Sequence, residues 1–193
     1  MKIQKILSSA ITAFLVLTLG LPTTAMANPP TRIQAVNAVQ FPADVEAQPS
    51  AGILTRQHQL LVADMALSGL DQMAAYTVWW IIWNDPSLCA TTPCSGADLG
   101  IKGNVVTHAA GFVTGDDGVA NVTARLAAGK LPVGKDSPIP TKLWKGRGMK
   151  AEVHMLVQSH GSIWPGKVHM QISIDGAACN PTCAGQQAMI FVP

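Results

Sequence analysis

The alternation of apolar and polar positions predicts short β-strands along most of the chain. Residues 76–83, with the sequence YTVWWIIW, would place apolar side chains on both faces of an extended strand. Such strands are usually central and covered, so we expect Trp79 and Trp80 to be largely buried. Trp83 lies beside the strand end and is expected to be the most exposed of the three. The following NDP sequence should end the strand, because proline cannot donate to a ladder.

Two connections have the composition of hairpin turns. Residues 105–114 and 119–127 flank GDDG, whose Asp-Gly step favours a hairpin turn. The second segment contains NVTARL, whose strict alternation is typical of a half-buried strand. Residues 151–160 and 167–174, with the sequences AEVHMLVQSH and KVHMQISI, are joined by the turn-rich GSIWPG. This pattern predicts a second hairpin.

Two other segments are assigned to strands on weaker patterns. Residues 53–75 are rich in Ala, Leu and Met, and their periodicity also fits a helix. We interpret them as two strands broken near Ser68 and Gly69. The last apolar segment, QQAMIFV at residues 186–192, is expected to close a sheet edge.

Together these segments predict an all-β fold. Many short strands, regular turns and no convincing βαβ alternation favour an antiparallel β-sandwich of immunoglobulin-like architecture, with an open barrel as the alternative. The cysteine spacing does not fit the bridge that joins the two sheets of antibody domains, so any immunoglobulin likeness would be architectural.

The first residues have the pattern of a secretory signal peptide. MKIQK is followed by an apolar run over residues 6–21 and by the small residues of AMA, which predicts cleavage after residue 27. The run is too short to span a bilayer comfortably, which takes ~20 apolar residues. We therefore expect export to the periplasm or the medium, with no transmembrane segment after cleavage. Prolines make residues 28–50 an expected flexible segment, and residues 51–193 an expected single domain.

The charge balance argues against a nucleic-acid partner. The chain has 13 Lys and Arg against 11 Asp and Glu, and removal of Lys2 and Lys5 with the signal peptide makes these numbers equal. A generally basic protein is therefore not indicated.

Four cysteines form two close pairs in the sequence, Cys89 with Cys94 and Cys179 with Cys183. In an oxidising compartment such thiols persist as disulfides. Local bridging is the simplest of the three connectivities, although sequence alone does not choose among them. The C-x4-C and C-x3-C spacings match no common zinc pattern.

The combination of YTVWWIIWNDPSLC, GFVTGDDGVANVTARLAAG and AEVHMLVQSHG, within residues 76–161, resembles a group of secreted bacterial and archaeal proteins without an assigned activity. The resemblance implies secretion and an all-β fold, and it supplies no reaction. Members of that group often have histidine where this chain has Phe112 and arginine where it has Gln158. These departures weaken a catalytic or metal-binding role based on the group's histidines.

The sequence supports no common catalytic class. It lacks G-x-S-x-G, H-E-x-x-H, a Walker loop and a dinucleotide fingerprint. A carbohydrate-active enzyme would need two carboxylates aimed into one cleft, and the chain's two glutamates are Glu46 and Glu152. Only Glu152 lies in a strongly patterned strand. Catalytic residues are therefore not assigned, and whether the protein is an enzyme is left open.

A basic stretch at residues 130–150 is a candidate ligand surface. It carries Lys142, Lys145 and Arg147 around Trp144, with Asp136 as its one acidic residue. These side chains would suit an anionic glycan, lipid headgroups or a partner protein. A solvated loop that keeps the protein soluble is the alternative.

The histidines suggest a metal site if the second hairpin forms. A turn centred between Gly161 and Ser162 would place His154 directly across from His169, with Glu152 on the same face. Two imidazoles and a carboxylate suit zinc or oxidised copper. A shift of one residue in register destroys the pairing, and histidines held by ordinary hydrogen bonds are the alternative.

These observations favour an exported binding or structural module with an unidentified ligand and no cofactor. A periplasmic copper- or zinc-binding protein is the second hypothesis, and a carbohydrate-active enzyme is the third. Trp83 and His160 join the basic stretch as candidate ligand contacts, because a tryptophan and a histidine that face solvent together would mark a ligand platform.

Overall fold

The computed structural model describes residues 30–41, 46–130, 142–173 and 178–193. The predicted signal peptide and residues 131–141 of the basic stretch lie outside these ranges. In the described residues the chain forms eight strands: β1 (Thr31–Gln40), β2 (Glu46–Gln57), β3 (Leu60–Leu67), β4 (Ala74–Trp83), β5 (Asn104–Val113), β6 (Ala120–Ala127), β7 (Glu152–Ser162) and β8 (Ala184–Phe191). Three short helices complete the structure: the 3-10 helices η1 (Pro86–Leu88) and η2 (Gly96–Asp98), and α1 (Val168–Ile172). None of the described helices is long and apolar enough to cross a membrane.

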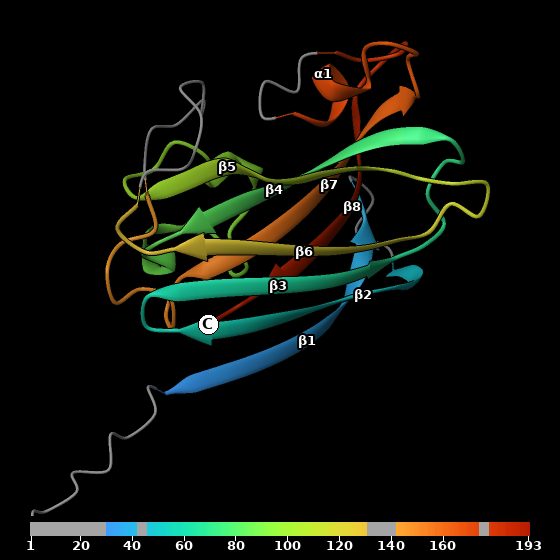
Figure 1. Cartoon of the computed structure of the whole chain (residues 1–193). Coiled ribbons are helices and arrows are strands. Elements are labelled where there is room, and N and C mark those ends of the chain that lie inside the picture. Colours follow the sequence, from blue (N-terminus) through green and yellow to red (C-terminus); the bar gives the residue numbers. More distant parts are fainter. Residues whose placement is uncertain (1–29, 42–45, 131–141, 174–177) are drawn as a thin grey trace, which may run out of the picture.

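All eight strands belong to one antiparallel sheet in the order β5-β4-β7-β8-β1-β2-β3-β6. The sheet rolls up so that its first and last strands, β5 and β6, approach each other (Figure 1). The all-β prediction is confirmed. The strands form one nearly closed sheet and not the two packed sheets of a β-sandwich. The fold therefore corresponds to the open barrel, which was the alternative arrangement.

The hydrophobic core fills the inside of this rolled sheet. On β4, Tyr76, Val78, Trp80 and Ile82 point inward and join apolar side chains from both halves of the sheet. Those partners include Leu54, Leu61, Ala63, Met65, Val122, Ala124, Val153, Met155, Met189 and Phe191. The alternate residues of β4 therefore face outward.

The outward face of β4 corrects the prediction for its tryptophans. Trp80 is 1% exposed, as predicted, and Trp79 is half-buried. Trp83 is only 2% exposed, so the prediction that it would be the most exposed was wrong. It lies at the strand end, but the loop that follows β4 folds back over it: the Trp83 indole N–H donates to the carbonyl of Asp98, 3.1 Å away.

Neither predicted hairpin forms. β5 and β6 are both strands, but they stand at opposite ends of the strand order, where the barrel comes closest to closing. The segment after β7 forms α1 in place of a strand, and β7 pairs with β4 and β8. β8 itself lies between β7 and β1, so it is not the sheet edge that was expected.

The early part of the chain also contributes more strands than the sequence indicated. The prolines suggested a flexible segment over residues 28–50, yet β1 within it pairs with both β2 and β8. Residues 53–75 contain the end of β2, all of β3 and the start of β4, and the break expected near Ser68 and Gly69 is present but extends to Met73. An additional turn at His58 and Gln59 separates β2 from β3. The sequence did not predict this turn, because its residues do not carry the usual Gly or Pro signal.

A charged side chain, Arg56 of β2, is fully buried within the barrel. Its Nη1 donates to the carbonyls of Ala151 at 2.7 Å and Gly148 at 3.2 Å, and its Nη2 donates to the carbonyl of Phe191 at 2.9 Å. Its Nε donates to Gln34 Oε1. Arg56 therefore ties together β1, β2, the segment before β7 and the end of β8.

Candidate functional site

A pocket of about 600 Å³ lies on the outer face of the barrel. Its floor is formed by outward-facing residues of β4, β7, β8 and β1, and its wall by the loop between β4 and β5. The lining is mainly apolar: Val39, Phe41, Ile81, Trp83, Pro93, Cys94, Ser95, Gly96, Leu99, His154, Leu156, Ala188 and Ile190.

The loop that forms the wall is held in shape by its own contacts. The disulfide Cys89–Cys94 joins Cα atoms 5.4 Å apart, which confirms the predicted local pairing. The buried carboxylate of Asp98 accepts from the backbone N–H of Ala90 at 2.8 Å and of Ser95 at 2.7 Å. These bonds to the charged form lower the pKa of Asp98. The wall is therefore preformed around its bridge and its carboxylate.

A buried His154–Glu152 pair lies at the floor of the pocket. Glu152 is 1% exposed, and its Oε1 accepts from the backbone N–H of Cys94 at 2.6 Å and lies 2.7 Å from His154 Nε2. The His154 ring packs edge-on against the Trp83 ring, with centroids 4.7 Å apart. The carboxylate thus connects the disulfide loop, through Cys94, to a histidine that lines the pocket.

The protonation of His154 follows from its burial. Desolvation lowers the pKa of His154, and this effect outweighs the opposing influence of Glu152. The neutral ring donates its Nε2–H to Glu152, which leaves Nδ1 as a hydrogen-bond acceptor. Nδ1 makes no hydrogen bond to any residue that the structure describes. A ligand hydroxyl or N–H could therefore bond to it.

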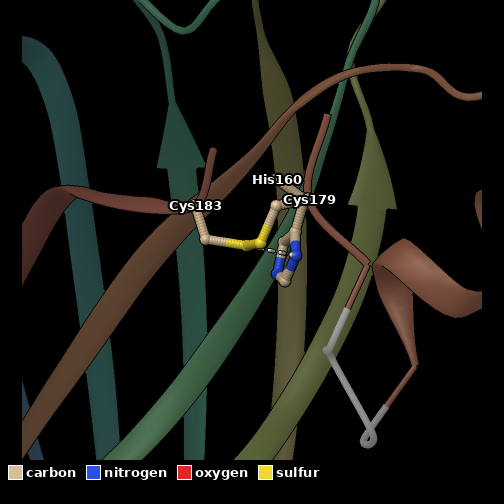
Figure 2. A group of neighbouring side chains, drawn as sticks. All are labelled: His160, Cys179 and Cys183. Atoms are coloured by element: carbon tan, nitrogen blue, oxygen red, sulfur yellow. Dashed lines mark hydrogen bonds between the residues drawn. A yellow bond between two sulfur atoms is a disulfide. The ribbon is translucent and has the colours of Figure 1, made fainter. Parts of the chain in front are cut away.

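His160 belongs to a second group, farther along β7. Its fully buried ring lies against the Cys179–Cys183 disulfide, with Nδ1 3.2 Å from Cys183 Sγ (Figure 2). Nδ1 also lies 3.2 Å from the carbonyl of Ala178, and Nε2 lies 2.8 Å from Thr77 Oγ1. Since a carbonyl only accepts, Nδ1 carries the proton and Nε2 accepts from the Thr77 hydroxyl. Because its ring is fully buried, His160 does not form the solvent-facing ligand platform that was expected.

The predicted metal set His154, His169 and Glu152 does not assemble. His154 pairs with Ile81 on β4 and Ile190 on β8, whereas His169 is an exposed residue of α1. The predicted His154–His169 register does not form, because the chain after β7 folds into a helix instead of a strand. Only the Glu152–His154 contact remains of the proposed set.

The described part of the basic stretch lies against the β4–β5 loop. Arg147 is 3.8 Å from the Asp85 carboxylate and lies over the Trp144 ring at 6.0 Å. Trp144 is half-buried, while Lys142 and Lys145 are exposed. None of these five residues lines the pocket.

The pocket is also lined by residues that the sequence did not predict as ligand contacts, among them Phe41, Leu99, Leu156 and Ile190. Phe41 is 46% exposed and Leu99 is 45% exposed, although both are large and apolar. A weak signal was present in the strands: Leu156 on β7 and Ile190 on β8 are large apolar residues at outward positions, which implies that this part of the outer face is covered. The sequence did not show that the β4–β5 loop, which covers this face, leaves a pocket beneath it.

No protein-family model, curated protein or solved structure gives a significant match to this chain. The resemblance to a group of secreted proteins therefore stays a prediction.

Proposed function

We propose that this is an exported binding protein that takes a small, mainly apolar molecule into the pocket beside His154. The pocket itself carries the proposal. Its volume of about 600 Å³ falls within the range of small-molecule sites, ~300–1,000 Å³. The signal-peptide pattern and the two disulfides support export.

The chemistry of the lining favours one class of ligand. Aliphatic and aromatic side chains cover most of the pocket and would bind an alkyl chain or an aromatic ring by excluding water. The acceptor Nδ1 of His154 would bond a hydroxyl or N–H on that ligand. An alcohol, phenol or amide with an apolar body therefore fits better than an anion.

Calorimetric titration with a medium-chain primary alcohol and with its methyl ether tests the proposal. We expect the alcohol to bind more tightly, because only the alcohol can donate to His154. In His154→Phe the alcohol should lose about 2- to 10-fold in affinity, the value of one net hydrogen bond, and the ether should change little.

A filling variant tests the location of the site. Ile190→Trp should abolish binding by occupying the pocket, whereas Val113→Trp, at a 44% exposed position of β5 outside it, should bind normally. Unchanged binding in Ile190→Trp, or no binding of either compound to the wild-type protein, would contradict the proposal. Circular dichroism of each variant separates loss of folding from loss of the site.

A further inference from the structure

The His160 group has the composition of a metal site held in its oxidised state (Figure 2). The ligand atoms of His160, Cys179 and Cys183 all lie within 4.8 Å of one another. Zinc bonds thiolate sulfur at ~2.3 Å and imidazole nitrogen at ~2.0 Å. Two ligand atoms of one zinc ion therefore lie no more than about 4.6 Å apart, close to the spacing in this group. We propose that reduction of the Cys179–Cys183 disulfide converts this group into a site for one thiolate-preferring metal ion, zinc(II) or copper(I).

The segment that carries the cysteines is docked on β7 by bonds that do not involve sulfur. The backbone N–H of Asn180 donates to the His160 carbonyl at 2.8 Å, and that of Ser162 donates to the Asn180 carbonyl at 3.1 Å. The Asn180 side chain donates to the Ser162 carbonyl at 3.2 Å. The buried side chain of Gln171, from α1, donates to the same carbonyls of His160 and Ser162 at 3.3 and 3.1 Å and so fixes this end of β7. The three bonds of Asn180 hold the cysteine segment beside His160 after the disulfide opens.

His160 also has the outer partner that a metal-bound histidine needs. A ligating imidazole usually donates its second ring N–H to a fixed acceptor. If Nδ1 binds the ion, its proton moves to Nε2, which then donates to Thr77 Oγ1 at 2.8 Å. Thr77 Oγ1 is itself fixed by the indole N–H of Trp79, which donates to it at 2.8 Å. The ring is therefore oriented before any ion arrives.

The conversion balances with a dithiol reductant. The reductant supplies two electrons and two protons, the S–S bond breaks, two thiols form, and the reductant becomes a disulfide. Binding of the ion then displaces both thiol protons to solvent. The imidazole stays neutral because its proton only moves from Nδ1 to Nε2. Affinity should therefore rise with pH, since the ion competes with protons for the two sulfurs.

The second disulfide provides an internal control. Within the described residues, the His160 group is the one cluster of three or more potential ligands, so Cys89–Cys94 has no equivalent histidine. Soft thiolate ligands favour zinc and copper(I) over the harder divalent ions. A reduced chain should thus bind one ion at Cys179 and Cys183 and none at Cys89 and Cys94.

The test compares the mature protein before and after reduction with a phosphine that does not itself hold the metal tightly. Cobalt(II) titration should give a thiolate-to-metal absorption band only in the reduced protein, and competition with a chromophoric chelator should give the zinc and copper(I) affinities. The band should persist in Cys89→Ser/Cys94→Ser and disappear in Cys179→Ser/Cys183→Ser. Thr77→Val should weaken binding by about 10- to 100-fold, the usual effect of removing an outer partner.

A measurement on the wild-type chain avoids dependence on any variant. Zinc should protect Cys179 and Cys183, but not Cys89 and Cys94, from alkylation, as mapped by peptide mass spectrometry. Equal alkylation of both pairs in the presence of zinc would overturn the proposal, as would equal metal affinity in the oxidised and reduced proteins.

Discussion

At the scale of single residues, buried polar side chains fix the interior more specifically than apolar packing does. Arg56 and Tyr76 each bond to at least one group that is distant in the sequence. Tyr76 is stacked on Phe112, with ring centroids 5.2 Å apart, and its hydroxyl accepts from the backbone N–H of Asp71 at 2.8 Å. The same hydroxyl lies 3.1 Å from Gln186 Oε1. The Arg56–Phe191 bond joins β2 to β8, and the Tyr76–Gln186 bond joins β4 to β8.

Arg56→Met should destabilise the protein strongly. The change keeps most of the buried volume but leaves the carbonyls of Gly148, Ala151 and Phe191 without their donor. Each buried acceptor left unpaired costs about 1–3 kcal/mol, so we expect a loss of at least about 3 kcal/mol in the free energy of unfolding, measured by urea denaturation. Arg125→Met, on the exposed face of β6, is the matched control and should change stability by less than about 0.5 kcal/mol. Equal effects of the two substitutions would contradict this account.

Tyr76, the one tyrosine of the chain, should titrate abnormally. Burial raises the pKa of its phenol from 10.0 to about 12. Below pH 10 the phenol is protonated in both folded and unfolded chains. Between pH 10 and 12 the unfolded chain releases this proton while the folded chain retains it, so stability falls as the pH rises. Ultraviolet titration of the folded protein should give the raised pKa, and Tyr76→Phe should lose stability less steeply over this interval. A phenol that ionises near pH 10 before the protein unfolds would refute the prediction.

At the scale of elements, most strands were predictable and their neighbours in the sheet were not. GDDG does connect two strands, but its ends diverge: the backbone N–H groups of Leu70 and Met73 donate to the carbonyls of Gly118 and Gly115. The turn is thus bonded to the β3–β4 connection. Local sequence identifies the turn, whereas partners distant in the sequence decide which strands it separates.

Gly161 marks a close approach between β7 and the Cys179–Cys183 segment. It has φ +77°, and a Cβ there would collide with the carbonyl oxygen of Asn180. Gly166 has the same φ, but a Cβ there would meet nothing within 4 Å. Gly166→Ala should therefore cost only the backbone penalty of about 1–2 kcal/mol. Gly161→Ala should cost about 1–3 kcal/mol more, from overpacking, in thermal unfolding experiments. If both variants melt together, the close approach is not a constraint on the fold.

At the scale of the whole molecule, one rolled sheet separates two environments. Its inside is the apolar core, and its outside carries the pocket and the His160 group under covering loops. Both candidate sites therefore depend on how loops fold back over outward strand positions. The core is shared by all strands and should govern global stability.

Trp80→Ala tests the shared core. Trp80 is 1% exposed in the barrel interior, and truncation of such a side chain typically costs about 3–5 kcal/mol. Trp164→Ala, at a 38% exposed position where the ring contacts Lys167, should cost less than about 1 kcal/mol. Both values come from urea denaturation of the mature protein. Near-normal stability of Trp80→Ala would contradict its place in the core.

The sequence by itself determined the all-β class and most strand positions, and it made local pairing of the cysteines the simplest of three connectivities. These features follow from alternation, turn residues and short spacings, which act over a few residues. It did not determine that β5 and β6 approach each other as the two end strands of a nearly closed sheet, that residues 168–172 form a helix, or that Trp83 is covered. The candidate sites were equally out of reach: His154 meets the disulfide loop through Glu152, and His160 meets Cys183 across 23 positions. Only the tertiary structure decided these contacts, because register and loop placement depend on interactions between residues far apart in the chain.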